Sequence, residues 1–450
     1  MNALTQYIDL YRAQQSVVNA HAPEALNRRR AAALAALEGM ERLPRKGDEG
    51  FAAVSLEDMF APDYGINIAR VPFAANERAE FSCDVPNIST ASALVVNDEF
   101  VPTASLAKAL PEGVEVMSLA RAAETYPELF AEPVEPRDNP IVALNTLFVQ
   151  DGVFIRVKRG VRAERPVQLL SIFNAAAPLM AARRIKIIVE DGAQASVLSC
   201  DHPRVNDFDY LSCRVVEVTL GTNARLDFYD LEEASPRTAR ASVLTASMGT
   251  GSMLNATGIY LNGGTTRNEY YAPLRRPGAQ VRLGGMVIAG SGQRVDNATF
   301  ITHDSPRCIS RQLFKYALFD DAEGAFEGLV TVCPGADNTD ARQTNRNLLA
   351  SPQARMHAEP QLIINCDEVK ASHGATTGQI DEKALFYMRS RGIPEAEARM
   401  MLINAFMTDV LDHIELPALR ERLRLLTDRR LRGCESTCRD CGIKTERGEA

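Results

Sequence analysis

The sequence predicts a mainly β protein, in which a parallel β-helix is flanked by an N-terminal helical or mixed domain and a C-terminal helical domain. After Val153, helical periodicity stops for about two hundred residues, and short runs rich in β-branched residues follow one another. A turn glycine followed by small or polar residues and a strand recurs at intervals of 29, 30 and 27 residues, at Gly192, Gly221, Gly251 and Gly278. A period of this size is typical of a solenoid, whose repeats bury their apolar faces by stacking.

The absence of helical pattern between the repeats favours a parallel β-helix over leucine-rich or ankyrin arrays. A fainter echo of the repeat occurs at Gly324 in "AEGAFEGLVTV". The alternative is a β-sandwich, whose strands would be spaced irregularly. We expect the β-helix to span residues 149–375.

The N-terminal domain is expected to span residues 1–148. Residues 3–39 show helical spacing that Pro23 interrupts, and "GMERLPRKGDEG" has the composition of a linker. "ALVVNDEF" predicts a strand that ends in a turn, whereas "SLARAAETYPELF" and "NPIVALNTLFV" predict helices. The basic run 28–30 lies in a helical pattern and is interpreted as a solvated face.

The sequence pattern of residues 376–432 predicts a C-terminal helical domain. Asp381 can cap the first helix, Pro394 suits the first turn of the second, and a third runs from Pro417 to about Leu431. The second helix is expected to present one apolar face, made of Ala398, Met401, Leu402, Ala405, Phe406 and Val410.

Nine cysteines show no pairing framework, so disulfides are not expected in a cytoplasmic chain. Six lie mostly in strand-like contexts and are interpreted as buried apolar filler: Cys83, Cys200, Cys213, Cys308, Cys333 and Cys366. The carboxylates Asp227, Asp230, Glu232 and Glu233 are interpreted as a solvated strand end.

The last segment, residues 433–450, is expected to be a flexible tail that carries Cys434, Cys438 and Cys441. Their C-x3-C-x2-C spacing offers three ligands for a 4Fe–4S cluster or for zinc, without a fourth Cys or His nearby. A redox-sensitive tail of uncertain role is the simpler interpretation.

Composition and motifs exclude several function classes. A net charge of −8 argues against nucleic-acid binding, and no segment is long and apolar enough to cross a bilayer. The N-terminus lacks the apolar centre of a signal peptide, so we expect a soluble cytoplasmic protein. No P-loop, G-x-G-x-x-G or G-x-S-x-G motif is present. A β-helix without a self-contained active site indicates a platform for partners and not an enzyme.

Two segments carry a family resemblance: "SHGATTGQIDEKALFYMRSRGI", from Ser372 to Ile393, and "QTNRNLL", from Gln343 to Leu349. The chain resembles the SufB/SufD family of iron–sulfur cluster assembly proteins, and "SHGAT" favours the SufD branch. The resemblance implies a right-handed parallel β-helix that pairs with a SufB-like paralogue. It also implies that a SufC-like ABC ATPase docks on the C-terminal helices, so that ATP chemistry belongs to that partner and this chain is a non-catalytic scaffold subunit.

The resemblance implies that His373, expected at a corner between the last strand and the first C-terminal helix, helps to hold a nascent cluster at the SufB interface. Neutral imidazole ligates iron, and small neighbours leave room for a cluster. Many relatives have cysteine where this chain has Ala371. We expect no permanently bound cofactor, only transient iron or an iron–sulfur cluster at the partner interface. Residues expected to contact the ATPase are Arg391, Gly392, Ile393, Met401 and Phe406.

Two other functions remain open on the sequence. A SufB-like scaffold acting as a homodimer would share the fold and the helices. A carbohydrate-active β-helix enzyme would be expected to have a secretion signal and aromatic sugar platforms, whereas this chain has no tryptophan.

Overall fold

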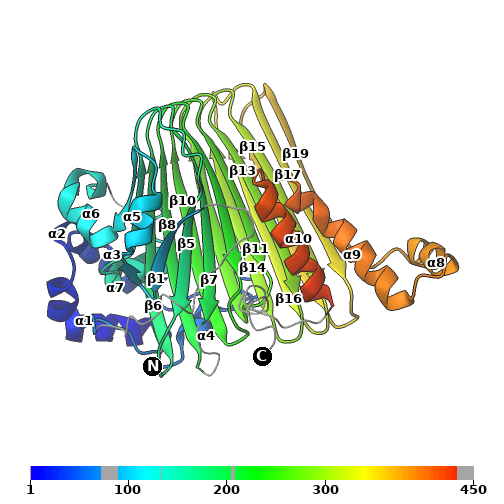
Figure 1. The fold of residues 1–450 in the computed structure, drawn as a ribbon, viewed down its shortest axis with the longest axis horizontal. Coiled ribbons are helices and arrows are strands. Elements are labelled where there is room, and N and C mark those ends of the chain that lie inside the picture. The colour runs from blue at the N-terminus through cyan, green and yellow to red at the C-terminus, as the bar shows by residue number, and fades with distance from the viewer. Residues whose placement is uncertain (1, 72–89, 133, 204–207, 433–450) are drawn as a thin grey trace, which may run out of the picture.

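Two parallel sheets wind into a β-solenoid of about seven turns, with helices at both ends of the chain (Figure 1). The computed structural model describes residues 2–71, 90–132, 134–203 and 208–432. From β4 onward, successive strands alternate between the sheets, and each pairs in parallel with the strand two places along the chain. This topology confirms the predicted β-helix and differs from a β-sandwich.

Sheet A contains nine strands: β3 Val114–Ser118, β4 Val153–Val157, β6 Leu179–Val189, β8 Tyr210–Leu220, β10 Thr238–Met248, β12 Thr265–Leu274, β14 Arg294–His303, β16 Glu323–Val332 and β18 Arg355–Ile364. Sheet B contains ten strands: β1 Ala91–Val96, β2 Glu99–Val101, β5 Val167–Phe173, β7 Gln194–Pro203, β9 Arg225–Glu232, β11 Met253–Tyr260, β13 Gln280–Ala289, β15 Ile309–Leu318, β17 Thr339–Leu349 and β19 Val369–Gly378. "ALVVNDEF" contains the predicted strand, β1, and the turn after it, and the chain then returns as β2 to form a hairpin.

The repeated glycines mark the turns that precede strands of sheet B, as expected. Gly192, Gly251 and Gly278 have φ values of 68°, 64° and 70°, a left-handed conformation in which a side chain is strained. Gly324 lies inside β16 of sheet A, so the echo placed there is not part of this repeat.

The N-terminal region supplies the helices α1 Ala3–Ala20, α2 Glu24–Asn27, α3 Arg30–Glu38, α4 Leu56–Phe60, α5 Ala104–Ala109, α6 Leu119–Thr125 and α7 Pro140–Phe148, with a 3-10 turn at Pro127–Phe130. Pro23 is the N-cap of α2, which confirms the predicted break in the first helical segment. Apolar side chains of α1, α3, α4 and α7 pack against the outer face of sheet A on β6, β8 and β10.

The prediction that the basic run 28–30 is a solvated face was wrong. Two of its three arginines make contacts with distant parts of the chain. Arg30 is 1% exposed and donates to the backbone carbonyls of Thr146, Leu147 and Val149 at the end of α7. Arg29 donates to the carbonyl of Phe130. Only Arg28 is the exposed residue that was expected.

The C-terminal helices are α8 Glu382–Ser390, α9 Glu395–Leu411 and α10 Pro417–Leu431, close to the predicted bounds. Asp381 caps α8 by accepting from the amides of Lys383 and Ala384. α9 and α10 pack on the outer face of sheet B, in a cluster with apolar residues of β9, β11 and β13 (Figure 1).

The predicted apolar face of α9 was partly wrong. The buried residues are Ala398, Ile403, Met407, Val410 and Leu411, while Met401 is 46% exposed and Ala405 is also exposed. The helix is apolar around much of its circumference, so the sequence pattern did not fix which side meets the sheet. The buried side of α9 is the side that packs against Ile259, Met286 and Ala317 of sheet B.

The four carboxylates interpreted as a solvated strand end are all buried, which corrects that interpretation: Asp227, Asp230, Glu232 and Glu233. Asp230 accepts from Arg214 of β8 and is also paired with Arg240 of β10. Buried carboxylates persist when cations and amides satisfy them, and Asp230 in this way joins sheet B to sheet A.

Cys200, Cys213 and Cys308 are buried as predicted, whereas Cys333 and Cys366 are half-buried in turns outside the strands. Cys83 and the tail cysteines Cys434, Cys438 and Cys441 lie outside the described residues. Among the helices that the structure describes, none combines the length and hydropathy needed to traverse a bilayer.

Candidate functional site at the open end of the solenoid

The last coil of the solenoid leaves one edge of each sheet open. β18 ends sheet A and β19 ends sheet B, and each pairs with only one neighbour in its sheet. Both strands are ten residues long; β19 is mostly exposed, and β18 ends on Ile363 and Ile364 at 47% and 44% exposure. Unpaired edge strands of this length are templates for pairing with another chain.

His373 lies in the middle of β19, so the predicted corner at this residue is wrong. The strand continues to Gly378 because "VKASHGATTG" pairs residue by residue with β17. The imidazole is exposed, and its Nδ1 lies 2.9 Å from the carbonyl oxygen of Pro360 on β18. A carbonyl only accepts, so Nδ1 carries a proton, and in the neutral ring Nε2 keeps a free lone pair.

A buried amide lies beside His373 in the ladder. Gln343 of β17 is its register partner and is 2% exposed, and neither side-chain atom has a hydrogen-bond partner among the described residues. Gly328 of β16 makes room for this side chain, since a Cβ there would lie 2.0 Å from its Nε2. The burial of Gln343 could not be predicted from the sequence, because the pattern of polar residues in this strand does not show which side faces the interior.

Neither Ala371 nor Cys366 places a thiolate beside His373. Ala371 precedes His373 by two residues, so both point to the same side of β19, and Ala371 packs against the interior cluster. Cys366 lies in the turn between β18 and β19, where its thiol donates to Asp337 Oδ1 at 3.1 Å. That hydrogen bond raises the pKa of Cys366, which disfavours the thiolate.

A second candidate surface lies at the junction of α8 and α9, which projects from the solenoid in Figure 1. Arg391, Gly392 and Ile393 form the turn between the helices, and Gly392 has a φ of 88°. Exposed apolar residues flank this turn. They are Phe386 at 72%, Tyr387 at 59% and Met401 at 46% exposure.

Phe406 does not lie on that exposed surface. Its ring is partly buried, with Lys315 Nζ 4.7 Å from the ring centroid, and its backbone carbonyl accepts from the same ammonium at 2.6 Å. Lys315 also pairs with Asp409. Phe406 therefore helps to fasten α9 to β15. Phe386 and Tyr387 were not predicted as contact residues from the sequence. The sequence does show two adjacent aromatic residues in this helix, and their exposure is seen only in the structure.

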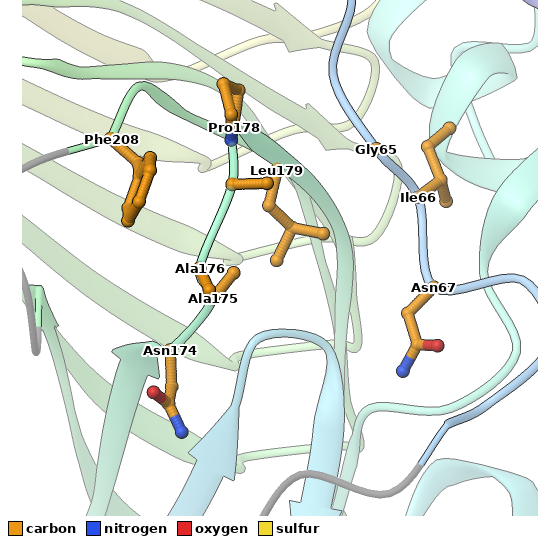
Figure 2. A pocket seen from close by; sticks show the side chains of 10 residues that line it. Gly65, Ile66, Asn67, Asn174, Ala175, Ala176, Pro178, Leu179 and Phe208 are labelled. Carbon is orange, nitrogen blue, oxygen red and sulfur yellow. The ribbon is translucent and has the colours of Figure 1, made fainter.

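The described part of the chain does not add a metal cage to these two surfaces. No three His, Cys, Asp or Glu side chains there gather as metal ligands. A cavity of about 680 Å³ lies between residues 65–67 and the loop before β6, and Figure 2 shows side chains that line it, among them Ala175, Ala176, Pro178, Leu179 and Phe208. Its polar side chains are Asn67 and Asn174. The Asn67 side-chain amide already donates to the carbonyl of Val71 and accepts from the amide of Val71.

Two family models match this chain. The SufBD core domain of the SUF system for FeS cluster assembly matches residues 172–406, and the SufBD protein N-terminal region matches residues 1–169. The chain belongs to the SufBD family. The core match covers the strands from β6 to β19 together with α8 and most of α9.

Relatives with curated names agree with this assignment. An iron–sulfur cluster assembly SufBD family protein of Synechocystis is 28% identical over 412 residues, covering 89% of each chain. SufD of Escherichia coli is 29% identical over 64% of this chain and 69% of its own. SufD of Bacillus subtilis is 25% identical over 75% of this chain and 79% of its own. The chain is thus a SufD-like member of the family, and these matches favour the assembly prediction over a carbohydrate-active enzyme.

Proposed function

We propose that this chain is a non-catalytic subunit of an iron–sulfur cluster assembly scaffold, and that it pairs with a SufB-like paralogue through the open edges of β18 and β19. The observation that carries this proposal is the uncapped last coil. Both ten-residue edges leave backbone groups unpaired, and the β18 edge also exposes Ile363 and Ile364, which a second β-helix could cover.

His373 is proposed to hold iron or a nascent cluster transiently at that interface, as cargo and not as a resident cofactor. The Pro360 carbonyl orients the ring and leaves Nε2 available, which is the arrangement found behind many metal-ligating histidines. The unpartnered Gln343 amide supplies polar atoms beside it. One imidazole cannot hold a cluster alone, so the remaining ligands would come from the partner.

The α8–α9 junction is proposed to dock a SufC-like ABC ATPase. Phe386, Tyr387, Ile393 and Met401 present apolar area, and Arg391 stacks on Tyr387 with its guanidinium carbon 5.2 Å from the ring centroid. Exposed aromatic and Arg side chains of this kind are typical anchors of protein interfaces. Removing the C-terminal helices would uncover the apolar face of sheet B. Point substitutions therefore test docking better than truncation.

The experiment is co-expression with the SufB-like and SufC-like chains, followed by affinity purification and mass measurement of the complexes. Ile363→Asp should remove the SufB-like chain and keep the ATPase, because the new charge would be buried in the paired edges. Phe386→Asp should have the opposite effect.

Leu425→Asp is the matched control for both variants. Leu425 is 56% exposed on α10, so this change adds the same charge away from both surfaces and should keep both partners. Retention of the SufB-like chain by Ile363→Asp would contradict the edge proposal. A stable homodimer that excludes the SufB-like chain would instead favour the SufB-like scaffold.

A further inference from the structure

A cavity of about 450 Å³ lies on the outer face of sheet B, beside the loop that joins α9 to α10. It is lined by two adjacent rows of outward-facing residues on β11, β13, β15 and β17 (Figure 1 labels these strands), and His413 of the loop contributes its edge. The cavity is separate from the edge strand β19 and from the α8–α9 turn.

One row of this cavity places three arginines side by side. The strand register aligns Arg282 of β13 with Arg311 of β15, and Arg311 with Arg342 of β17. Neighbouring strands lie about 4.8 Å apart, and like charges directly opposite one another destabilise a sheet. Such a row needs counter-charge.

The residues that the structure describes supply only part of that counter-charge. Asp340 pairs with Arg311, and its other oxygen lies 3.5 Å from Arg342 Nε. Asp227 stands two strands away from Arg282, where it pairs with Arg225 and accepts from Asn255. The Arg282 side chain has no hydrogen bond or ion pair among the described residues. At least one guanidinium in the cavity is therefore uncompensated.

The adjacent row forms the floor and adds hydroxyl groups. It consists of Thr257, Gly284, Leu313 and Thr344, in register. The missing side chain at Gly284 hollows the floor, since a Cβ there would lie 3.3 Å from Thr257 Oγ1 and any larger group would project into the cavity. The floor thus provides space and two neutral donors beneath the guanidinium row.

We propose that this cavity binds a small anion that carries phosphate groups, with Arg282 as its main contact and Arg311, Arg342 and the threonine hydroxyls as further donors. The planar guanidinium fork matches phosphate oxygens in a bidentate manner, and a row of forks suits a ligand with more than one charged group. The volume lies in the range of small-molecule sites and is too small for a folded partner. The site lies outside the proposed partner surfaces and stands independently of them.

The test is calorimetric titration of the purified full-length chain with pyrophosphate, beside inorganic phosphate and citrate. Pyrophosphate should bind most tightly, with an affinity that falls as salt rises. Arg282→Gln should weaken pyrophosphate binding about tenfold or more, because it removes a charged hydrogen bond without breaking an internal ion pair. Gly284→Val should abolish binding by filling the floor with a residue that suits a strand.

Arg355→Gln is the matched control. Arg355 is an exposed arginine on β18 of the other sheet, and its loss should change the affinity less than about twofold. Circular dichroism and melting temperature verify that each variant is folded. Absence of pyrophosphate binding, equal losses in Arg282→Gln and Arg355→Gln, or undiminished binding by folded Gly284→Val would each overturn the site. Citrate binding as tight as pyrophosphate binding would overturn the phosphate assignment.

Discussion

At the scale of single residues, two histidines show how surroundings set a role. His303 is completely buried, with Nε2 2.9 Å from Ser310 Oγ and Nδ1 3.5 Å from Thr339 Oγ1. Both hydroxyls adapt their hydrogens to a neutral ring. His373 is exposed, and its one hydrogen-bond partner among the described residues is the Pro360 carbonyl. The first is a core residue whose charging is costly, and the second has a nitrogen free for a ligand.

His373→Ala should therefore leave the complex intact and reduce its cargo. Loss of one exposed hydrogen bond should cost less than about 1 kcal/mol of folding free energy. If Nε2 ligates iron, iron and sulfide per mole of purified complex should fall markedly while the melting temperature stays within about 2 °C. Ser372→Ala, at the exposed neighbouring position, should change neither quantity. A lower melting temperature with unchanged iron per intact complex would make His373 structural.

His303 should make stability depend on pH between about 6.5 and 4. Burial lowers the pKa of His303 from 6.5 to about 4. In that window the unfolded chain binds a proton that the folded chain does not, so stability falls as pH decreases, by on the order of 3 kcal/mol in total. Below pH 4 both states are protonated and this loss stops. His303→Gln, which cannot titrate, should show a smaller loss in urea unfolding between pH 7 and pH 4.5. Equal losses in the two proteins would contradict the assignment.

At the scale of elements, the ends of helices are held by side chains that are distant in sequence. The terminal carbonyls of α7 have no intrahelical partner, and the Arg30 guanidinium of α3 satisfies three of them at 2.5 to 3.0 Å. Burial lowers the pKa of Arg30 to about 10, so it remains charged at neutral pH and complements the negative end of the helix dipole. Arg30 thus links two N-terminal helices into the layer that covers sheet A.

Arg30→Ala should destabilise the protein by about 2 to 4 kcal/mol, because three buried carbonyls lose their donor. Arg28→Ala is the matched control. Arg28 is 72% exposed and pairs with Glu24 on the same helical face, so its loss should cost less than about 0.5 kcal/mol. Chemical unfolding of the three proteins measures the difference. Similar midpoints for Arg30→Ala and Arg28→Ala would show that solvent replaces the donor.

At the scale of the whole molecule, the two sheets are joined by charge as well as by apolar packing. Arg183, Arg214 and Arg240 of sheet A contact Asp201 and Asp230 of sheet B, and all five are almost completely buried. Burial raises the pKa of Asp230, yet Arg214 and Arg240 together hold it at about 2. Its contribution to stability is therefore present above about pH 3.8 and is lost as pH falls toward 2.

Asp230→Asn should destabilise the solenoid by about 3 to 5 kcal/mol at neutral pH, because it leaves buried guanidinium charge without its anion. Since neighbouring coils share their core, the midpoint of the whole unfolding transition should shift. Asp209→Asn is the control, as Asp209 and its partner Arg237 are about half exposed and their ion pair is worth less than about 1 kcal/mol. An unchanged transition in Asp230→Asn would show that the network is dispensable.

The sequence by itself determined the local structure and the family. The glycines at Gly192, Gly251 and Gly278 require left-handed turns, Asp381 and Pro417 mark helix starts, and β-branched runs mark strands. These are signals of backbone conformation and alternation, which each segment carries within itself. The motif "SHGATTGQIDEKALFYMRSRGI" was specific enough to indicate the family.

Only the tertiary structure decided which side of each element is buried and what a polar residue meets there. Arg30, Asp230 and Gln343 look like surface residues in sequence, yet each is buried because a distant strand or helix covers it. The buried side of α9 and the continuation of β19 through His373 were set by sheet B. The row Arg282, Arg311 and Arg342 arises from register between strands about thirty residues apart. Such pairings depend on contacts between segments, which no local pattern encodes.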